Sequence, residues 1–99
     1  DFDAWDHHLD EVIRLLAEKG LGLEINTSGV KKTPSYLMPE ERGIRRYREL
    51  GGENLTLGAD AHVPRDVGSG ICRGLAAARA AGFKWLCYYE ERKPRHIKI

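Results

Sequence analysis

The stretch Leu57-Gly58-Ala59-Asp60-Ala61-His62 is a short apolar run that ends in an aspartate and a histidine separated by one residue. If residues 54–58 form a strand, Asp60 and His62 lie in the loop that follows it, where open α/β sheets and barrels carry their reactive groups. A carboxylate oxygen and an imidazole nitrogen are preferred ligands of zinc, manganese and iron. The stretch therefore predicts that Asp60 and His62 are metal ligands.

A second interpretation of the same letters is open. Two protein ligands do not complete a metal site, which needs at least three protein donors or bound water. In a polar loop without metal, Asp60 would cap the next helix and His62 would face solvent. The Asp-x-His pattern alone does not decide between these interpretations.

The composition is that of a soluble globular protein with one small domain. The chain has 99 residues, of which 41% are hydrophobic and 31% are charged. Its net charge of +1 argues against a dedicated nucleic-acid-binding protein. No apolar run approaches the roughly 20 residues of a membrane span, and the first residues are acidic, unlike a signal peptide. We expect a cytoplasmic protein with no membrane partner, in which Cys72 and Cys87 are reduced thiols.

Hydrophobic periodicity predicts three helices that alternate with three strands. The first helix, over residues 4–19, would bury Leu9, Val12, Ile13 and Leu16 on one face. The remaining elements are predicted as a strand over 21–26, a helix over 39–50, a strand over 54–58, a helix over 71–81 and a strand over 83–89. Residues 90–99 are charged and are expected to be extended, with His96 as a tail residue rather than a ligand.

The predicted order αβαβαβ, in units of about 30 residues, is typical of right-handed parallel crossovers and indicates the α/β class. Three parallel strands would leave open sheet edges and a thin core, as in part of a larger structure. Open edges tend to recruit another chain. We therefore expect self-association or exchange of elements between copies.

The segment after the first strand is a candidate anion site. It reads Asn26-Thr27-Ser28-Gly29, and Lys31 and Lys32 follow shortly after. Amide and hydroxyl groups, a glycine that lets backbone approach a ligand, and lysine ammonium groups together suit a phosphate. A polar loop with solvated lysines explains the same composition, and both interpretations stay open.

The helix over 39–50 carries several arginines. They resemble a nucleic-acid-binding patch, but Glu41 with Arg45 and Arg45 with Glu49 are favourable pairs at i, i+4 spacing. We interpret this surface as a solvated helix face.

Four blocks of the sequence resemble the histidinol-phosphate phosphatases of the PHP (polymerase and histidinol phosphatase) superfamily. They are Leu23-Glu24-Ile25-Asn26-Thr27-Ser28-Gly29, Leu57-Gly58-Ala59-Asp60-Ala61-His62, Asp66-Val67-Gly68, and Gly82-Phe83-Lys84 with Arg92-Lys93-Pro94. The resemblance covers nearly all of the chain. It implies that residues 1–99 form one domain, the C-terminal part of an incomplete, distorted β/α barrel, since such a barrel needs roughly 200 residues or more.

The resemblance also implies a site and an activity. In this family the strand ends hold two or three divalent metal ions, and the enzymes hydrolyse phosphomonoesters. Asp60 and His62 match the family's last metal-binding motif, each as a ligand of a different ion. As catalytic groups they would activate water on manganese, zinc or iron. Asn26, Ser28 and Lys31 would bind the substrate's phosphate. Relatives often carry arginine where this chain has Val63, and Arg65 is the candidate replacement.

The family's early His-x-His motif, bridging glutamate and middle histidines have no counterpart in this sequence. We therefore expect the isolated chain to be inactive and its parent to be a phosphatase of histidine biosynthesis that acts on histidinol phosphate. One alternative is a non-catalytic anion-binding or assembly module that uses residues 26–32 and 60–65. Another is a PHP hydrolase of a different small phosphate ester.

Overall fold

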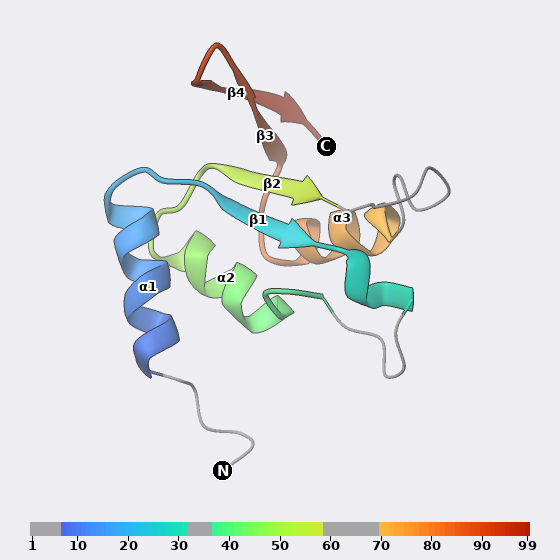
Figure 1. Ribbon diagram of the computed structural model, residues 1–99, viewed down its shortest axis with the longest axis horizontal. Helices are drawn as coiled ribbons and strands as arrows, with labels where there is room; N and C mark the ends of the chain where they lie inside the picture. Colours follow the sequence, from blue (N-terminus) through green and yellow to red (C-terminus); the bar gives the residue numbers. More distant parts are fainter. Residues whose placement is uncertain (1–6, 32–36, 59–69) are drawn as a thin grey trace.

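The computed structural model describes residues 7–31, 37–58 and 70–99, with only the backbone of Lys31. In chain order the elements are α1 (His7–Glu18), β1 (Leu23–Asn26), the 3-10 helix η1 (Ser28–Lys31), α2 (Glu41–Glu49), β2 (Leu55–Gly58), α3 (Ile71–Ala80), β3 (Trp85–Glu90) and β4 (Lys93–Lys98) (Figure 1). Each predicted helix and strand is present, with ends shifted by a few residues. Within the described ranges, no helix combines the length and apolar character that crossing a membrane requires.

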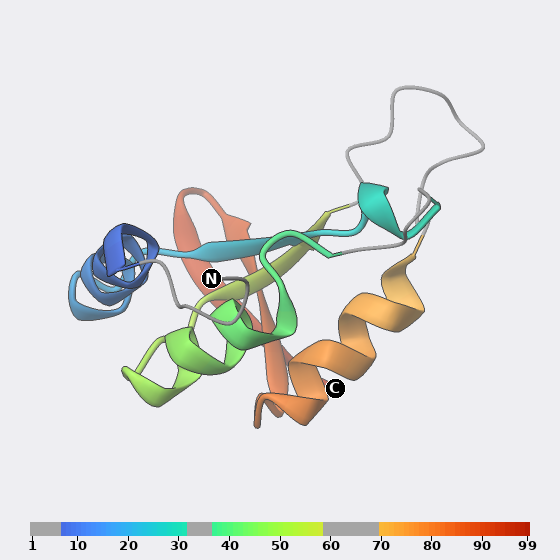
Figure 2. The ribbon, with the colours of Figure 1, turned by 90° about the horizontal axis from the view of Figure 1, so that it is seen from below.

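The centre of the fold is a two-stranded parallel sheet in which Leu23 of β1 pairs with Leu55 of β2. Figure 2 shows α2 and α3 on one side of these strands. Ile25 and Leu55 point toward that side and are fully buried, in one core with Ile44 of α2 and Ala78 of α3. The fold is thus mixed α/β with helices packed on a parallel pair of strands.

The predicted third parallel strand is wrong. β3 instead pairs antiparallel with β4, from Trp85 opposite Lys98 to Glu90 opposite Lys93. The chain reverses at Glu91 and Arg92, which have φ angles of 51° and 66°. Such turns favour asparagine and glycine, and neither residue type occurs at these two positions to indicate a hairpin. The extended C-terminal segment is therefore an exposed strand, and the described parallel sheet has two strands instead of three.

The apolar face predicted for α1 is only partly buried. Ile13 is 1% exposed, whereas Leu9 and Val12 are 41% and 52% exposed. The reason is that α1 lies beside α2 at one end of the sheet, so a narrow strip of its surface meets the core (Figure 1). Periodicity identified the helix correctly but overestimated the width of its contact.

One outer edge of β1 is partly covered. The backbone N–H of Asn26 donates to the carbonyl of Met38 at 2.7 Å, and the N–H of Met38 donates back at 3.2 Å. This antiparallel bridge lies outside the parallel pair, at the last residue of β1. Self-association through open strand edges stays a prediction.

The side chain of Tyr47 joins α2 to the segments that lead into both parallel strands. Its hydroxyl donates to the carbonyl of Leu21 at 2.8 Å and accepts from the backbone N–H of Asn54 at 3.1 Å. The ring is fully buried and stacks on Phe83 with centroids 6.2 Å apart. Burial raises the pKa of the Tyr47 hydroxyl above its usual value, so the group stays a neutral donor.

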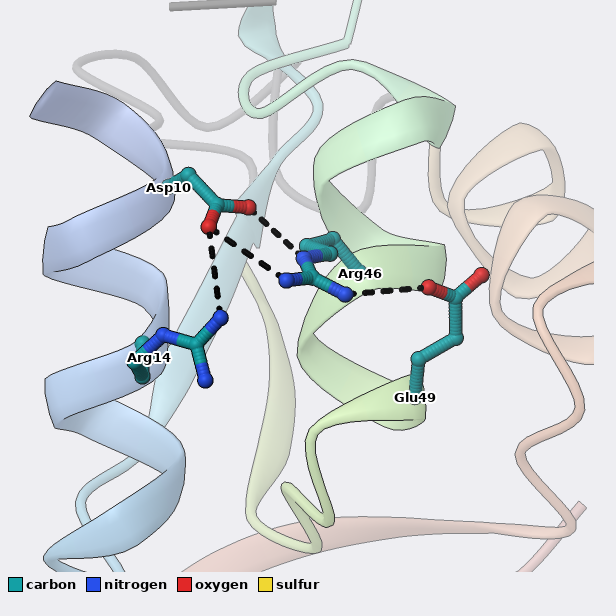
Figure 3. A network of polar contacts seen from close by, with 4 residues as sticks. All are labelled: Asp10, Arg14, Arg46 and Glu49. Carbon is teal, nitrogen blue, oxygen red and sulfur yellow. Dashed lines mark hydrogen bonds and ion pairs between the residues drawn. The ribbon is translucent and has the colours of Figure 1, made fainter. Parts of the chain in front are cut away.

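Two of the four arginines of α2, Arg46 and Arg48, are half-buried, whereas the others are exposed as predicted. Arg46 Nε donates to Asp10 Oδ1 of α1 at 2.6 Å, and Arg46 Nη1 lies 3.5 Å from Glu49 Oε2 (Figure 3). The guanidinium of Arg48 lies over the rings of Phe83 and Trp85, 5.5 and 5.3 Å from their centroids. Among the described side chains, the two glutamates predicted to pair with Arg45 have other partners: Glu49 lies near Arg46 of the same helix, and Glu41 lies 3.8 Å from Arg73 of α3.

We predict that Tyr47→Phe lowers the free energy of unfolding by about 1–3 kcal/mol, because it removes the shared partner of the Leu21 carbonyl and the Asn54 N–H at a partly buried position. Urea denaturation followed by circular dichroism measures the change. Tyr88→Phe is the matched control, since Tyr88 is 49% exposed. Equal stability of both variants would show that the Tyr47 hydroxyl does not fasten α2 to the strands.

We also predict that Glu91→Asn combined with Arg92→Gly raises the free energy of unfolding by about 1 kcal/mol or more, because both residues then tolerate the left-handed backbone of the turn. Thermal denaturation measures the shift. Lys93→Gly, one residue beyond the turn and inside β4, should lower stability instead. A loss of stability in the double variant would contradict the observed turn geometry.

Candidate functional site

The carboxyl ends of β1 and β2 meet at one edge of the sheet, where Asn26 pairs with Gly58. Asn26 Oδ1 accepts from the backbone N–H of Ser28 at 2.9 Å, a short side-chain turn that starts η1. The N–H of the fully buried Thr27 donates to the carbonyl of Gly58 at 2.8 Å. These bonds fix the direction in which the chain leaves β1.

Helix α3 begins against the same edge because two glycines allow a close approach. A Cβ on Gly74 would lie 2.8 Å from Leu57 Cδ2 and 3.0 Å from Thr27 Cγ2. Gly70, with a φ of 72°, comes equally close to Val30 and to the carbonyl of Thr27. The strand ends, η1 and the start of α3 therefore converge (Figure 1).

The structure brings together part of the predicted site. Asn26 and Ser28 lie at the carboxyl edge, and the backbone of Lys31 ends η1 on the same side. The side-chain oxygen of Asn26 is engaged with Ser28, so its amide nitrogen is the group that remains to contact a ligand. The predicted anion-binding segment is thus an ordered turn and 3-10 helix.

The predicted metal ligands Asp60 and His62, and the predicted phosphate contact Arg65, lie outside the described residues. β2 ends at Gly58, two residues before Asp60. Among the residues that the structure describes, no three histidine, cysteine, aspartate or glutamate side chains are grouped to hold a metal ion. The metal site therefore stays a prediction from the sequence.

Glu24 was not among the predicted site residues, but it lies beside the candidate site. Alternation along the strands puts Glu24 and Asn26 on the face opposite Ile25, away from the helices. A Cβ on Gly58 would lie 2.8 Å from Glu24 Oε2 and 3.1 Å from Oε1. The signal in the sequence was a carboxylate at an outward position of a strand whose inward positions are apolar, together with a glycine at the end of the next strand.

The opposite end of the sheet holds the hairpin. Trp85 Nε1 donates to the carbonyl of Glu53 at 3.0 Å, and His96 Nε2 lies 3.0 Å from Asn54 Oδ1. An open depression of about 570 Å³ lies beside these contacts. His96 is therefore part of the hairpin's attachment to the start of β2, and it lies far along the strand from the carboxyl edge.

No family model matches the chain. It is 31% identical over 90 residues to a probable histidinol-phosphatase of Thermotoga maritima, covering 87% of this chain and 36% of the relative. A probable histidinol-phosphatase of Clostridium acetobutylicum is 29% identical over 93 residues, which are 92% of this chain and 35% of the relative. The chain is histidinol-phosphatase-like. It spans about a third of the length of the curated relatives that it matches.

A solved structure supports the same likeness. The histidinol-phosphatase-like fold matches the crystal structure of histidinol phosphate phosphatase from Lactococcus lactis subsp. lactis Il1403 with a TM-score of 0.79 and 28% identity. The match covers 90% of this chain and 34% of that protein, which was crystallised with zinc, L-histidinol and phosphate. The resemblance inferred from the sequence is confirmed.

The turn at Asn26 gives a prediction of its own. Asn26→Ala should lower the free energy of unfolding by about 0.5–2 kcal/mol, because the N–H of Ser28 loses its side-chain acceptor at the start of a helix. Asn26→Asp keeps an acceptor oxygen and should stay close to the parent chain. Chemical denaturation compares the two, and an equal loss in both variants would contradict a capping role.

Proposed function

We propose that this chain forms part of a metal-dependent phosphomonoester hydrolase that acts on histidinol phosphate in histidine biosynthesis. The observation that carries the proposal is the match, over nine tenths of the chain, to a protein crystallised with L-histidinol, phosphate and zinc. In the parent protein we expect a PHP-type distorted β/α barrel, of which residues 1–99 are the C-terminal part. The cytoplasm is the expected location.

The proposal assigns a role to each candidate residue. Asp60 and His62 would each hold a different divalent metal ion, and these ions when bound supply an activated water and neutralise charge on the phosphate. Ser28, Lys31 and Arg65 would contact the phosphate oxygens from the loops at the carboxyl edge. The ordered turn at Asn26 and Ser28 supports this assignment, since a phosphate site needs donors in fixed positions.

The parallel pairing of β1 and β2 brings the two loops of the proposed site together. Both run toward one edge, so the segment after β1 and the segment after β2 start side by side, with Asn26 opposite Gly58. A phosphate-binding loop and a metal-binding loop that leave adjacent strand ends can serve one reacting group. The remaining metal ligands would come from the part of the parent that this chain does not span.

We predict that the longest polypeptide encoded by its reading frame releases phosphate from histidinol phosphate when manganese or zinc is supplied. His62→Ala should lower kcat at least about 100-fold, because it removes a metal ligand. His96→Ala is the matched control, since His96 lies at the hairpin end of the sheet. Phosphate release is measured colorimetrically, with metal content measured in the same samples.

Other outcomes separate the alternatives. We expect the isolated chain of 99 residues to show no release above its own His62→Ala variant. Bound phosphate without turnover in the longer polypeptide would favour a non-catalytic anion-binding module. Turnover of a different ester with no turnover of histidinol phosphate would favour a hydrolase with another substrate. Equal turnover by the His62→Ala variant and the parent would reject the metal role of His62.

A further inference from the structure

The face of the parallel sheet that points away from α2 and α3 is polar. Its side chains come from two register pairs, Glu24 opposite Thr56 and Asn26 opposite Gly58. None of these four residues belongs to the hydrophobic core, whereas their neighbours Ile25 and Leu55 are its fully buried members. One face of the sheet therefore packs against the core, and the polar side chains of the other face are available to contact a ligand.

The carboxylate of Glu24 does not lie over its own register partner. Both of its oxygens lie within 3.1 Å of the place that a Cβ of Gly58 would occupy, so the side chain leans one residue pair toward the carboxyl edge. Only a residue without a side chain leaves that space free. The space left by the missing side chain of Gly58, here called the cradle, thus holds the carboxylate of Glu24 and places its charge near the candidate phosphate site.

The carboxylate has the wrong sign to bind phosphate. Among the described residues, no lysine, arginine or histidine pairs with Glu24, and the Glu24 side chain is exposed to solvent. An unpaired carboxylate held beside a phosphate site raises the affinity for a ligand that is anionic at one end and cationic at the other. The same charge repels phosphate esters that lack a cationic group.

We propose that Glu24, held by the space at Gly58, is a specificity-determining residue that binds the cationic half of the substrate, an amino alcohol esterified to phosphate. The inference rests on the proposed function for the identity of that amino alcohol, L-histidinol. In this arrangement the ammonium group donates to the Glu24 carboxylate on the polar face, while the phosphate is bound at the carboxyl edge by the loop after β1.

The test uses the longest polypeptide of the reading frame, with Glu24→Gln and Gly58→Ala as variants. Glu24→Gln keeps the shape and removes the charge, and Gly58→Ala fills the cradle and displaces the carboxylate. Glu53→Gln is the matched control, because Glu53 is an exposed carboxylate at the other end of β2. The readout is kcat/KM with histidinol phosphate divided by kcat/KM with p-nitrophenyl phosphate, whose leaving group carries no ammonium.

We expect this ratio to fall about 10- to 100-fold in Glu24→Gln and in Gly58→Ala, the effect of losing one hydrogen bond to a charged group. It should stay within about twofold in Glu53→Gln, and metal content should not change in any variant. An equal fall with both substrates, or a loss of metal in Glu24→Gln, would overturn the proposal in favour of a general structural or metal-binding role. An unchanged ratio would overturn it as well.

Calorimetric titration with L-histidinol separates this inference from the proposed function. If the polypeptide hydrolyses neither ester but binds L-histidinol, and Glu24→Gln weakens binding about 10-fold or more, the proposed activity fails and the role of Glu24 stands. If hydrolysis occurs and Glu24→Gln binds L-histidinol as tightly as the parent, the activity stands and the role of Glu24 fails. If L-histidinol does not bind at all, the inference is overturned.

Discussion

The hydroxyl of Tyr47 is the polar contact on which the arrangement of the sheet depends. It lies between the carbonyl of Leu21 and the N–H of Asn54, the residues just before the two parallel strands. The ring fills the space beneath Gly52, where a Cβ would lie 2.4 Å from the ring carbon Cε1. A single side chain of α2 thereby sets the starting points of β1 and β2, and with them the register that brings Asn26 opposite Gly58.

The order of helices and of the first two strands could be predicted from the sequence because each has a strong local pattern. The helices have apolar residues at helical spacing with glycine beyond their ends, and Leu23 and Ile25 alternate with polar residues. The hairpin could not be predicted in this way. Glu91 and Arg92 adopt positive φ without the glycine or asparagine that marks such a turn, so the direction of β3 depends on tertiary contacts such as that of Trp85 with Glu53.

The candidate site could be predicted from the sequence only where polar residues directly follow a recognisable strand. Asn26 and Ser28 follow a recognisable strand, and the structure places them at its carboxyl edge. Glu24 was missed because its importance comes from a neighbour that is 34 residues away in sequence, and register between strands is not visible in one sequence. The shared edge of two strands converts separate segments into one surface.

The narrow attachment of α1 has a consequence for how the molecule opens. Ile13 is its one fully buried side chain, and a polar link to α2, the pair of Asp10 and Arg46, is partly exposed (Figure 3). The parallel strands, by contrast, are held by core side chains and by Tyr47 at once. Local fluctuations should therefore release α1 before the sheet, and amide protons of α1 should exchange with solvent deuterium while those of β1 and β2 are still protected. The carboxyl edge would keep its shape throughout such an excursion.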